Sequence, residues 1–346
     1  METIRLTQFS HGGGCGCKIA PAVLADLLAR APAGIVPPQL LVGAETADDA
    51  AVYQLNERQA IVATTDFFTP IVDDPFDFGR IAATNAISDV YAMGATPIMA
   101  LAVVGMPLDK LPGEVIGRIL EGGASICREA GIPIAGGHSI DVLEPIYGLV
   151  ALGVVDPALV KRNAGARAGD RLVLGKPLGV GILSAALKKG LLDADGYAEM
   201  IRHTTRLNTP GPALAAMDAV HAVTDVTGFG LAGHLLEVCR GSRLAARLDF
   251  DRIPLIDAAA GFARDGIATG ASGRNWAGYC DQVHLAPGMQ DWQQKLLTDP
   301  QTSGGLLVSC APEAVADVLA CFDQAGFDQA AEIGALSTGL VSLSVV

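Results

Sequence analysis

The chain has 346 residues, of which half are hydrophobic and 18% are charged, and its formal net charge at pH 7 is −13. A chain of this length and composition can bury more than one core, so two domains are expected. Its acidity excludes a basic surface for a phosphate backbone, so nucleic acid is not an expected partner. A bound nucleotide would need metal ions, lysines or backbone amides to offset the negative field.

The sequence shows no membrane-spanning, secretory or disulfide pattern, which is typical of a cytoplasmic protein. The longest apolar runs, residues 97–108 and 147–155, are shorter than the roughly 18 residues that span a bilayer. The first residues lack the basic and apolar regions of a secretory signal. The seven cysteines lie far apart except for Cys15 and Cys17, which is not a disulfide framework. We therefore expect a cytoplasmic location and no membrane partner.

The order of the predicted elements indicates an α/β (α+β) fold. Residues 1–40 form a glycine- and cysteine-rich segment followed by a predicted helix at 21–30. Residues 41–157 form a first domain, in which short apolar runs alternate with helical patterns. The strands are predicted at 50–53, 60–65, 98–105, 132–135 and 146–155, and the helices at 78–93 and 111–130.

A polar stretch at residues 156–170 predicts the domain junction. The remainder, residues 158–346, is the predicted C-terminal α+β domain. Its first half contains strands predicted at 171–174 and 219–224 and helices predicted at 181–189 and 230–239.

Residues 11–18 read His-Gly-Gly-Gly-Cys-Gly-Cys-Lys. The glycines let the backbone approach a ligand, and a neighbouring cation favours a reactive thiolate. A flexible tail, a partial metal site and a redox Cys-x-Cys pair stay open as alternatives, although the second ligand pair of a closed zinc site is lacking. Lys18 could place a positive charge on phosphates, but no Walker A motif surrounds it.

Several aspartates stand at the ends of apolar segments. Mg²⁺ prefers oxygen ligands, and a buried carboxylate without a partner is costly. We therefore predict Asp49, Asp89 and Asp225 as metal ligands, whereas Asp48 also suits a capping role.

A second type of motif is glycine-rich. Residues 135–139, Ala-Gly-Gly-His-Ser, are predicted to form a turn that closes a strand, either an ordinary tight turn or a cradle for a phosphate or ribose. Residues 176–181 and 299–305 are similar turns with weaker signals. The histidines His203, His221, His234 and His284 have no mutual ligand spacing and are interpreted as structural.

Taken together, these segments resemble the selenophosphate synthetase (selenide, water dikinase) family, class I, of the aminoimidazole ribonucleotide synthetase-like superfamily. The resemblance covers nearly the whole chain. The segment that sets this family apart is Gly-Cys-Gly-Cys-Lys at 14–18. The shared motifs are Asp-Asp-Ala-Ala-Val-Tyr at 48–53, Thr-Thr-Asp-Phe-Phe at 64–68, Asn-Ala-Ile-Ser-Asp at 85–89, Gly-Gly-His-Ser at 136–139, Thr-Asp-Val-Thr-Gly-Phe-Gly at 224–230 and Asp-Pro-Gln-Thr-Ser-Gly-Gly at 299–305.

The resemblance implies an enzyme that converts selenide, ATP and water into selenophosphate, AMP and phosphate. Selenophosphate is the selenium donor for selenocysteine and selenouridine synthesis. It implies that Cys15 and Lys18 are catalytic and that Mg²⁺ is held by Asp49, Asp89 and Asp225. The implied ATP contacts are Lys18, Thr46, Ala47, Asp48, Asp66, Asp89, Gly137, His138 and Ser139. This chain has Cys15 where some relatives carry selenocysteine, and Ala47 where relatives often carry a basic residue.

The implied fold has two domains, and the N-terminal one dimerises through a shared β-sheet or barrel, with ATP near the interface of the homodimer. The sequence leaves open the number of metal ions, a need for a monovalent cation such as K⁺, a protein that delivers selenide and the role of Cys17.

One alternative function is a selenium or metal carrier that uses Cys15 and Cys17 without catalysis, and another is a related superfamily kinase. The aspartates argue against the carrier, and the cysteines argue against the kinase.

Overall fold

The fold is described by a computed structural model that covers residues 4–10, 12–19, 23, 27, 30, 35–43 and 48–346. The predictions for His11, Thr46 and Ala47, and most of the helix predicted at 21–30, lie outside these residues. No helix in the described part of the chain is both long and apolar enough to cross a membrane.

The first half of the chain forms a six-stranded sheet. Only β4 and β5 are parallel, and every other neighbouring pair is antiparallel. The strand order is β1 (Leu40–Val42), β2 (Ala51–Asn56), β3 (Gln59–Phe68), β6 (Ile146–Val155), β4 (Thr96–Met106) and β5 (Ile134–Asp141).

The predicted glycine turn at 135–139 is wrong, because these residues lie inside β5. Gly136 and Gly137 have φ angles of 150° and 154°, which residues with a side chain rarely adopt. A Cβ atom on Gly137 would also collide with the backbone carbonyl oxygen of Ala102 in β4. The glycines therefore allow a close parallel pairing of β5 with β4 where the sequence suggested a chain reversal.

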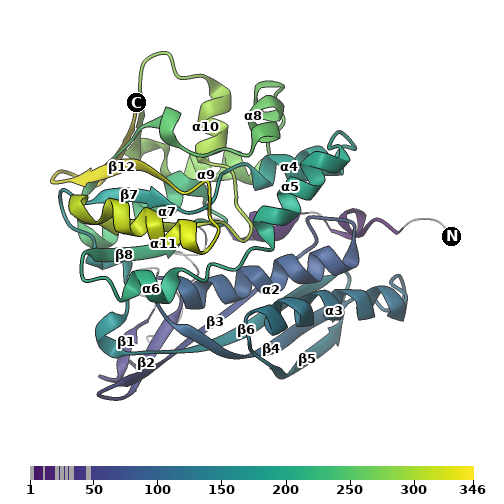
Figure 1. Ribbon diagram of the computed structural model, residues 1–346. Helices are drawn as coiled ribbons and strands as arrows, with labels where there is room; N and C mark the ends of the chain where they lie inside the picture. Colours follow the sequence, from purple (N-terminus) through teal and green to yellow (C-terminus); the bar gives the residue numbers. More distant parts are fainter. Residues whose placement is uncertain are drawn as a thin grey trace.

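Two helices, α2 (Pro75–Ala92) and α3 (Gly113–Glu129), cover one face of this sheet (Figure 1). The Asp74 side chain caps α2 by accepting from the Asp77 N–H, and Pro75 fits the first turn. α2 contacts β3 and β6 of the first sheet and also contacts the second half of the chain, so it is buried on most sides. Polar residues on α2 therefore lie between the two halves.

The second half forms a mixed seven-stranded sheet with helices around it (Figure 1). The strand order is β10 (Val283–Leu285), β13 (Ser342–Val345), β9 (Ala245–Leu248), β12 (Ala331–Ser337), β7 (Arg171–Leu174), β11 (Leu306–Cys310) and β8 (Val220–Asp225). The helices are α4 (Val180–Lys188), α5 (Ala194–Thr204), α6 (Gly211–Ala215), α7 (Gly230–Ser242), α8 (Asp257–Arg264), α9 (Gly270–Tyr279), α10 (Asp291–Leu297) and α11 (Val315–Gln324).

Short 3₁₀ helices complete the chain. They are η1 (Leu6–Phe9), η2 (Gly14–Cys17), η3 (Pro157–Leu159), η4 (Asn163–Gly165), η5 (Phe250–Arg252), η6 (Cys280–Gln282) and η7 (Pro312–Ala314). We call residues 12–19, which contain η2, the head. Through η2 the head contacts β3 of the first half and α9 of the second, so it bridges the two halves.

Candidate active site

Three carboxylates from distant parts of the chain meet where the two halves join. Asp49 precedes β2, Asp89 lies on α2 and Asp225 ends β8. One ligand oxygen from each lies within 4.8 Å of the other two. We call these three residues the aspartate cluster. Its members are the three aspartates predicted as metal ligands, and the described part of the chain holds no second cluster of this kind.

Hydroxyl groups orient each member of the cluster. Thr64 in β3 donates to Asp89 Oδ2 at 2.5 Å, and Ser88 on α2 donates to Asp225 Oδ2 at 2.5 Å. Thr224 in β8 donates to Asp49 Oδ1 at 2.9 Å. Each carboxylate thus has one oxygen fixed by a hydroxyl, which leaves its other oxygen available for a ligand.

The electrostatics of the cluster favour a bound cation. Burial, and then the charges of Asp225 and Asp89, raise the pKa of Asp49 well above its usual value. Burial and the charge of Asp225 likewise raise the pKa of Asp89. Burial raises the pKa of Asp225 against the opposing effect of its Ser88 hydrogen bond. A divalent cation would remove this repulsion, and the oxygen-only donor set fits Mg²⁺.

Cys15 is buried beside the cluster, with 1% of its surface exposed. Its Sγ donates to Asn85 Oδ1 at 3.2 Å, and its backbone N–H donates to Thr302 Oγ1 at 3.2 Å. Burial and then Asp66 raise the Cys15 pKa well above its usual value, although Lys18 lowers it. The Lys18 charge lowers the Cys15 pKa, as the sequence led us to expect, but burial and the Asp66 charge outweigh it. They favour the thiol form of Cys15 in this conformation.

Lys18 points at the same region. Its Nζ lies 3.4 Å from Asp66 Oδ2 in β3, while 40% of its side-chain surface stays exposed. Asn85 Nδ2 donates to the same Asp66 oxygen at 2.6 Å. Buried Asn85 therefore links Cys15 to Asp66, and Lys18 pairs with Asp66 directly.

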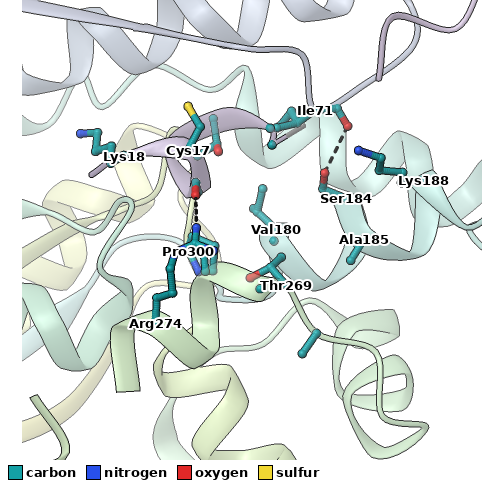
Figure 2. A pocket seen from close by; sticks show the side chains of 18 of the residues that line it. Cys17, Lys18, Ile71, Val180, Ser184, Ala185, Lys188, Thr269, Arg274 and Pro300 are labelled. Carbon is teal, nitrogen blue, oxygen red and sulfur yellow. Dashed lines mark hydrogen bonds between the residues drawn. The ribbon is translucent and has the colours of Figure 1, made fainter. Parts of the chain in front are cut away.

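Loops of the second half hold the head in place. Gly228, in the loop between β8 and α7, lies so close that a Cβ atom there would be 2.7 Å from the Cys15 carbonyl oxygen. Gly14 has a φ of 55° and packs against Thr302 and Ile71. Arg274 on α9 donates to the Gly16 carbonyl oxygen at 2.9 Å (Figure 2).

The structure does not bring every predicted residue to the cluster. Gly137 lies three strands from Asp66, because Asp66 pairs with Leu149, Leu149 with Ala102 and Ala102 with Gly137. At a strand spacing of about 4.8 Å this places Gly137 about 14 Å from Asp66. His138 and Ser139 follow on the same exposed edge strand. Asp48 accepts a hydrogen bond from the N–H of Asn163, 115 positions away, at 2.6 Å, a long-range contact and not the local cap that the sequence suggested.

The sequence interpretation gave no role to several polar residues around the site. The clearest is Asn85, which is fully buried and whose Oδ1 also accepts from the Ser303 N–H at 2.7 Å. Lys176 Nζ donates to the Ser303 and Arg206 carbonyl oxygens, and burial lowers its pKa to about 7. A polar residue in the middle of the apolar helix α2 was the available signal for Asn85, since a buried amide requires partners.

Sequence comparison finds similar proteins over the full length. The family "AIR synthase related protein, N-terminal domain" matches residues 47–155, and the corresponding C-terminal domain matches residues 167–341. A selenide, water dikinase from Burkholderia orbicola is 67% identical over 99% of this chain and 96% of its own length. Selenide, water dikinases from Dechloromonas aromatica and Rhizobium meliloti are 65% and 57% identical, over 100% and 99% of this chain and 99% and 98% of their own lengths.

Solved structures share the fold at lower identity. A thiamine-monophosphate kinase from Stenotrophomonas maltophilia superposes with a TM-score of 0.66 over 95% of this chain and 96% of its own, at 21% identity. The hydrogenase maturation protein HypE from E. coli gives a TM-score of 0.64 over 90% and 89%, at 18% identity. At these identities the likeness concerns the fold.

Proposed function

This chain belongs to the selenide, water dikinase family, and from that membership we propose that the aspartate cluster, Lys18 and Cys15 form its active site. The activity is the ATP-dependent formation of selenophosphate from selenide and water. The observation that carries the assignment of the site is the meeting of three carboxylates, one buried and two half-buried, beside the cysteine-bearing head.

The aspartate cluster is the proposed Mg²⁺ site. Bound there, Mg²⁺ would neutralise phosphate charge and stabilise the charge that develops during phosphoryl transfer. The residues of the chain supply the positioning: Thr64, Ser88 and Thr224 hold the carboxylates, and each hydroxyl belongs to a strand or helix of the core. Rigid supports of this kind keep ligands in one geometry.

Lys18 and Asp66 are the proposed polar contacts to ATP. The exposed stem of Lys18 leaves its ammonium group able to turn from Asp66 to a phosphate oxygen, where it would stabilise negative charge. Asp48 and Asp89 flank the same region in the proposed nucleotide site. For Thr46 and Ala47 the proposal rests on the family resemblance alone.

Cys15 is the proposed selenium contact. Its burial and its hydrogen bond to Asn85 keep the sulfur at a fixed point beside Asp66. The loops that hold the head leave Cys15 almost without contact with bulk solvent, which would slow the premature hydrolysis of a reactive phosphoryl intermediate. The carrier alternative leaves the aspartate cluster without a purpose.

An assay of selenide-dependent AMP formation tests the site, using wild type, Cys15→Ser and Asp225→Asn. We expect Asp225→Asn to lower kcat/KM at least 100-fold, because one ligand of the metal and one charge are lost. We expect Cys15→Ser to abolish selenide-dependent turnover. We also expect Mg²⁺ to raise the melting temperature of wild type and to have little effect on Asp225→Asn.

Cys280→Ser and Asp323→Asn are the matched controls, because both residues are exposed and lie outside the proposed site. Both should retain wild-type turnover. ATP turnover by wild type that is indifferent to selenide would refute the proposed reaction. Full activity in Asp225→Asn would refute the metal assignment.

A further inference from the structure

A cavity of about 670 Å³ lies against the head (Figure 2). The head contributes Gly16, Cys17 and Lys18 to its lining, and α4 and α9 provide much of the remainder. A cavity of this size is in the range of ligand sites rather than packing defects. The proposed active site does not account for it.

The lining of this cavity is cationic although the protein is strongly acidic. Lys188 and Lys189 lie at the end of α4, and Arg274 lies on α9. Figure 2 shows Lys188 and Arg274 on opposite sides of the view, and Lys188 Nζ donates to the Ser10 carbonyl oxygen at 3.3 Å. Among the described lining residues there is no aspartate or glutamate, and none of these three cations forms an ion pair with a described residue.

The two cysteines of the head differ in their surroundings. Cys15 is directed at Asn85, next to Asp66, whereas Cys17 lines the cationic cavity and donates to the Gly14 carbonyl oxygen. The head thus separates an acidic region from a cationic one. Without bound Mg²⁺, the acidic region would repel an anion that approaches Cys15, whereas the cationic cavity would attract one.

A second, water-sized cavity lies against Cys15 and next to the large cavity. Its lining includes Cys15, and it shares Gly16, Lys18, Ala271 and Arg274 with the large cavity. Arg274 therefore lies between the two spaces, where it also holds the Gly16 carbonyl oxygen. A route from the large cavity to Cys15 past Arg274 would admit only a small solute.

We propose that the cationic cavity is the vestibule through which a small chalcogenide anion, hydroselenide (HSe⁻), reaches Cys15. This inference rests on the proposed function and adds the route of its anionic substrate. Selenide is present mainly as the hydroselenide anion at neutral pH, so Lys188, Lys189 and Arg274 would raise its local concentration. The cavity is far larger than the ion, so it concentrates the anion by its field and does not enclose it tightly.

Alkylation of Cys17 tests the field without requiring catalysis. The full chain is treated with iodoacetate, an anion, or iodoacetamide, its neutral counterpart, and each cysteine is quantified by peptide mass spectrometry. Exposed Cys280 is the internal reference. At low salt the iodoacetate-to-iodoacetamide rate ratio should be about three- to tenfold higher at Cys17 than at Cys280, and Lys188→Gln/Lys189→Gln should remove most of this difference.

A matched variant, Lys110→Gln/Arg118→Gln, removes the same charge from around α3 and should leave the Cys17 ratio unchanged. In kinetics, Lys188→Gln/Lys189→Gln should raise the KM for selenide at least threefold while kcat and the KM for ATP stay unchanged. Equal ratios at Cys17 and Cys280 would overturn the vestibule. A changed ratio with an unchanged KM for selenide would overturn the route. If wild type makes no AMP from selenide, the proposed function fails while the alkylation result still reports on the cavity.

Discussion

At the scale of single residues, Asp299 is a buried carboxyl group that fixes the start of α4. Its Oδ2 accepts from the Gly181 and Ile182 N–H groups, and its Oδ1 has no hydrogen-bond partner in the described structure. Burial raises its pKa from 3.8 to about 7, although these hydrogen bonds oppose the shift. The folded protein therefore binds this proton more tightly than the unfolded chain does.

The sign of this linkage gives a pH prediction. Asp299 contributes stability that is fully present below pH 4 and is lost as pH rises toward 7, with a cost of up to about 4 kcal/mol. Asp299→Asn carries no charge and keeps an oxygen for the two N–H groups. Its melting temperature should therefore rise relative to wild type between pH 5 and pH 8, measured by thermal unfolding. Exposed Asp265→Asn is the control, and parallel curves for Asp299→Asn and wild type would contradict the prediction.

At the scale of elements, the loop between β8 and α7 has two tasks. It follows Asp225, a member of the aspartate cluster, and its Gly228 presses against the backbone of the head. The loop thereby sets the distance between the cluster and Cys15. Asn275 on α9 fixes the loop by donating to the Gly228 carbonyl oxygen at 2.9 Å.

Gly228→Ala should displace the head without unfolding the core. The new Cβ atom would lie 2.7 Å from the Cys15 carbonyl oxygen, which is closer than such atoms pack. We expect at least a tenfold loss of selenide-dependent AMP formation and faster alkylation of Cys15. The matched control is Gly273→Ala on α9, where nothing lies within 4 Å of the added atom. An unchanged Cys15 alkylation rate would show that the contact does not hold the head.

At the scale of the whole molecule, each half of the chain contains one sheet, and we propose that residues 41–157 and 158–346 are its two domains. β5 is an edge of the first sheet, and nearly all of its residues are exposed. Ile140 on β5 is 51% exposed, Leu143 three residues later is 83% exposed, and Leu108, whose N–H donates to Asp141 in β5, is 63% exposed. An exposed strand edge with apolar residues favours pairing with another chain.

We therefore expect a homodimer that uses the β5 edge, which would also bring Gly137, His138 and Ser139 toward a nucleotide site. Ile140→Lys should shift the protein to monomer at micromolar concentration in sedimentation velocity and lower AMP formation, because a charge on an edge strand opposes pairing. Leu340→Lys, at a 90% exposed position in the second half, is the control. A wild-type monomer, or a dimer unaffected by Ile140→Lys, would contradict this prediction.

The sequence by itself determined the family, the two-domain α/β (α+β) class and the activity, and the comparisons confirm these predictions. Motifs such as Gly-Cys-Gly-Cys-Lys at 14–18 are local, and hydrophobic periodicity reports burial along a single element, so both can be read without coordinates. The strand at 134–141 was misjudged because Gly136 and Gly137 usually signal turns, and only the pairing with β4 shows that they serve a strand.

Tertiary structure decided how distant residues meet. Thr224 and Asp49 are 175 positions apart, and Ser88 and Asp225 are 137 apart, so no local pattern could show their hydrogen bonds. The raised pKa of Cys15 is also a result of the tertiary structure, because its burial depends on the loops that cover the head. The cationic cavity has the same origin: Lys188 and Arg274 face one space only after α4 and α9 have packed beside the head.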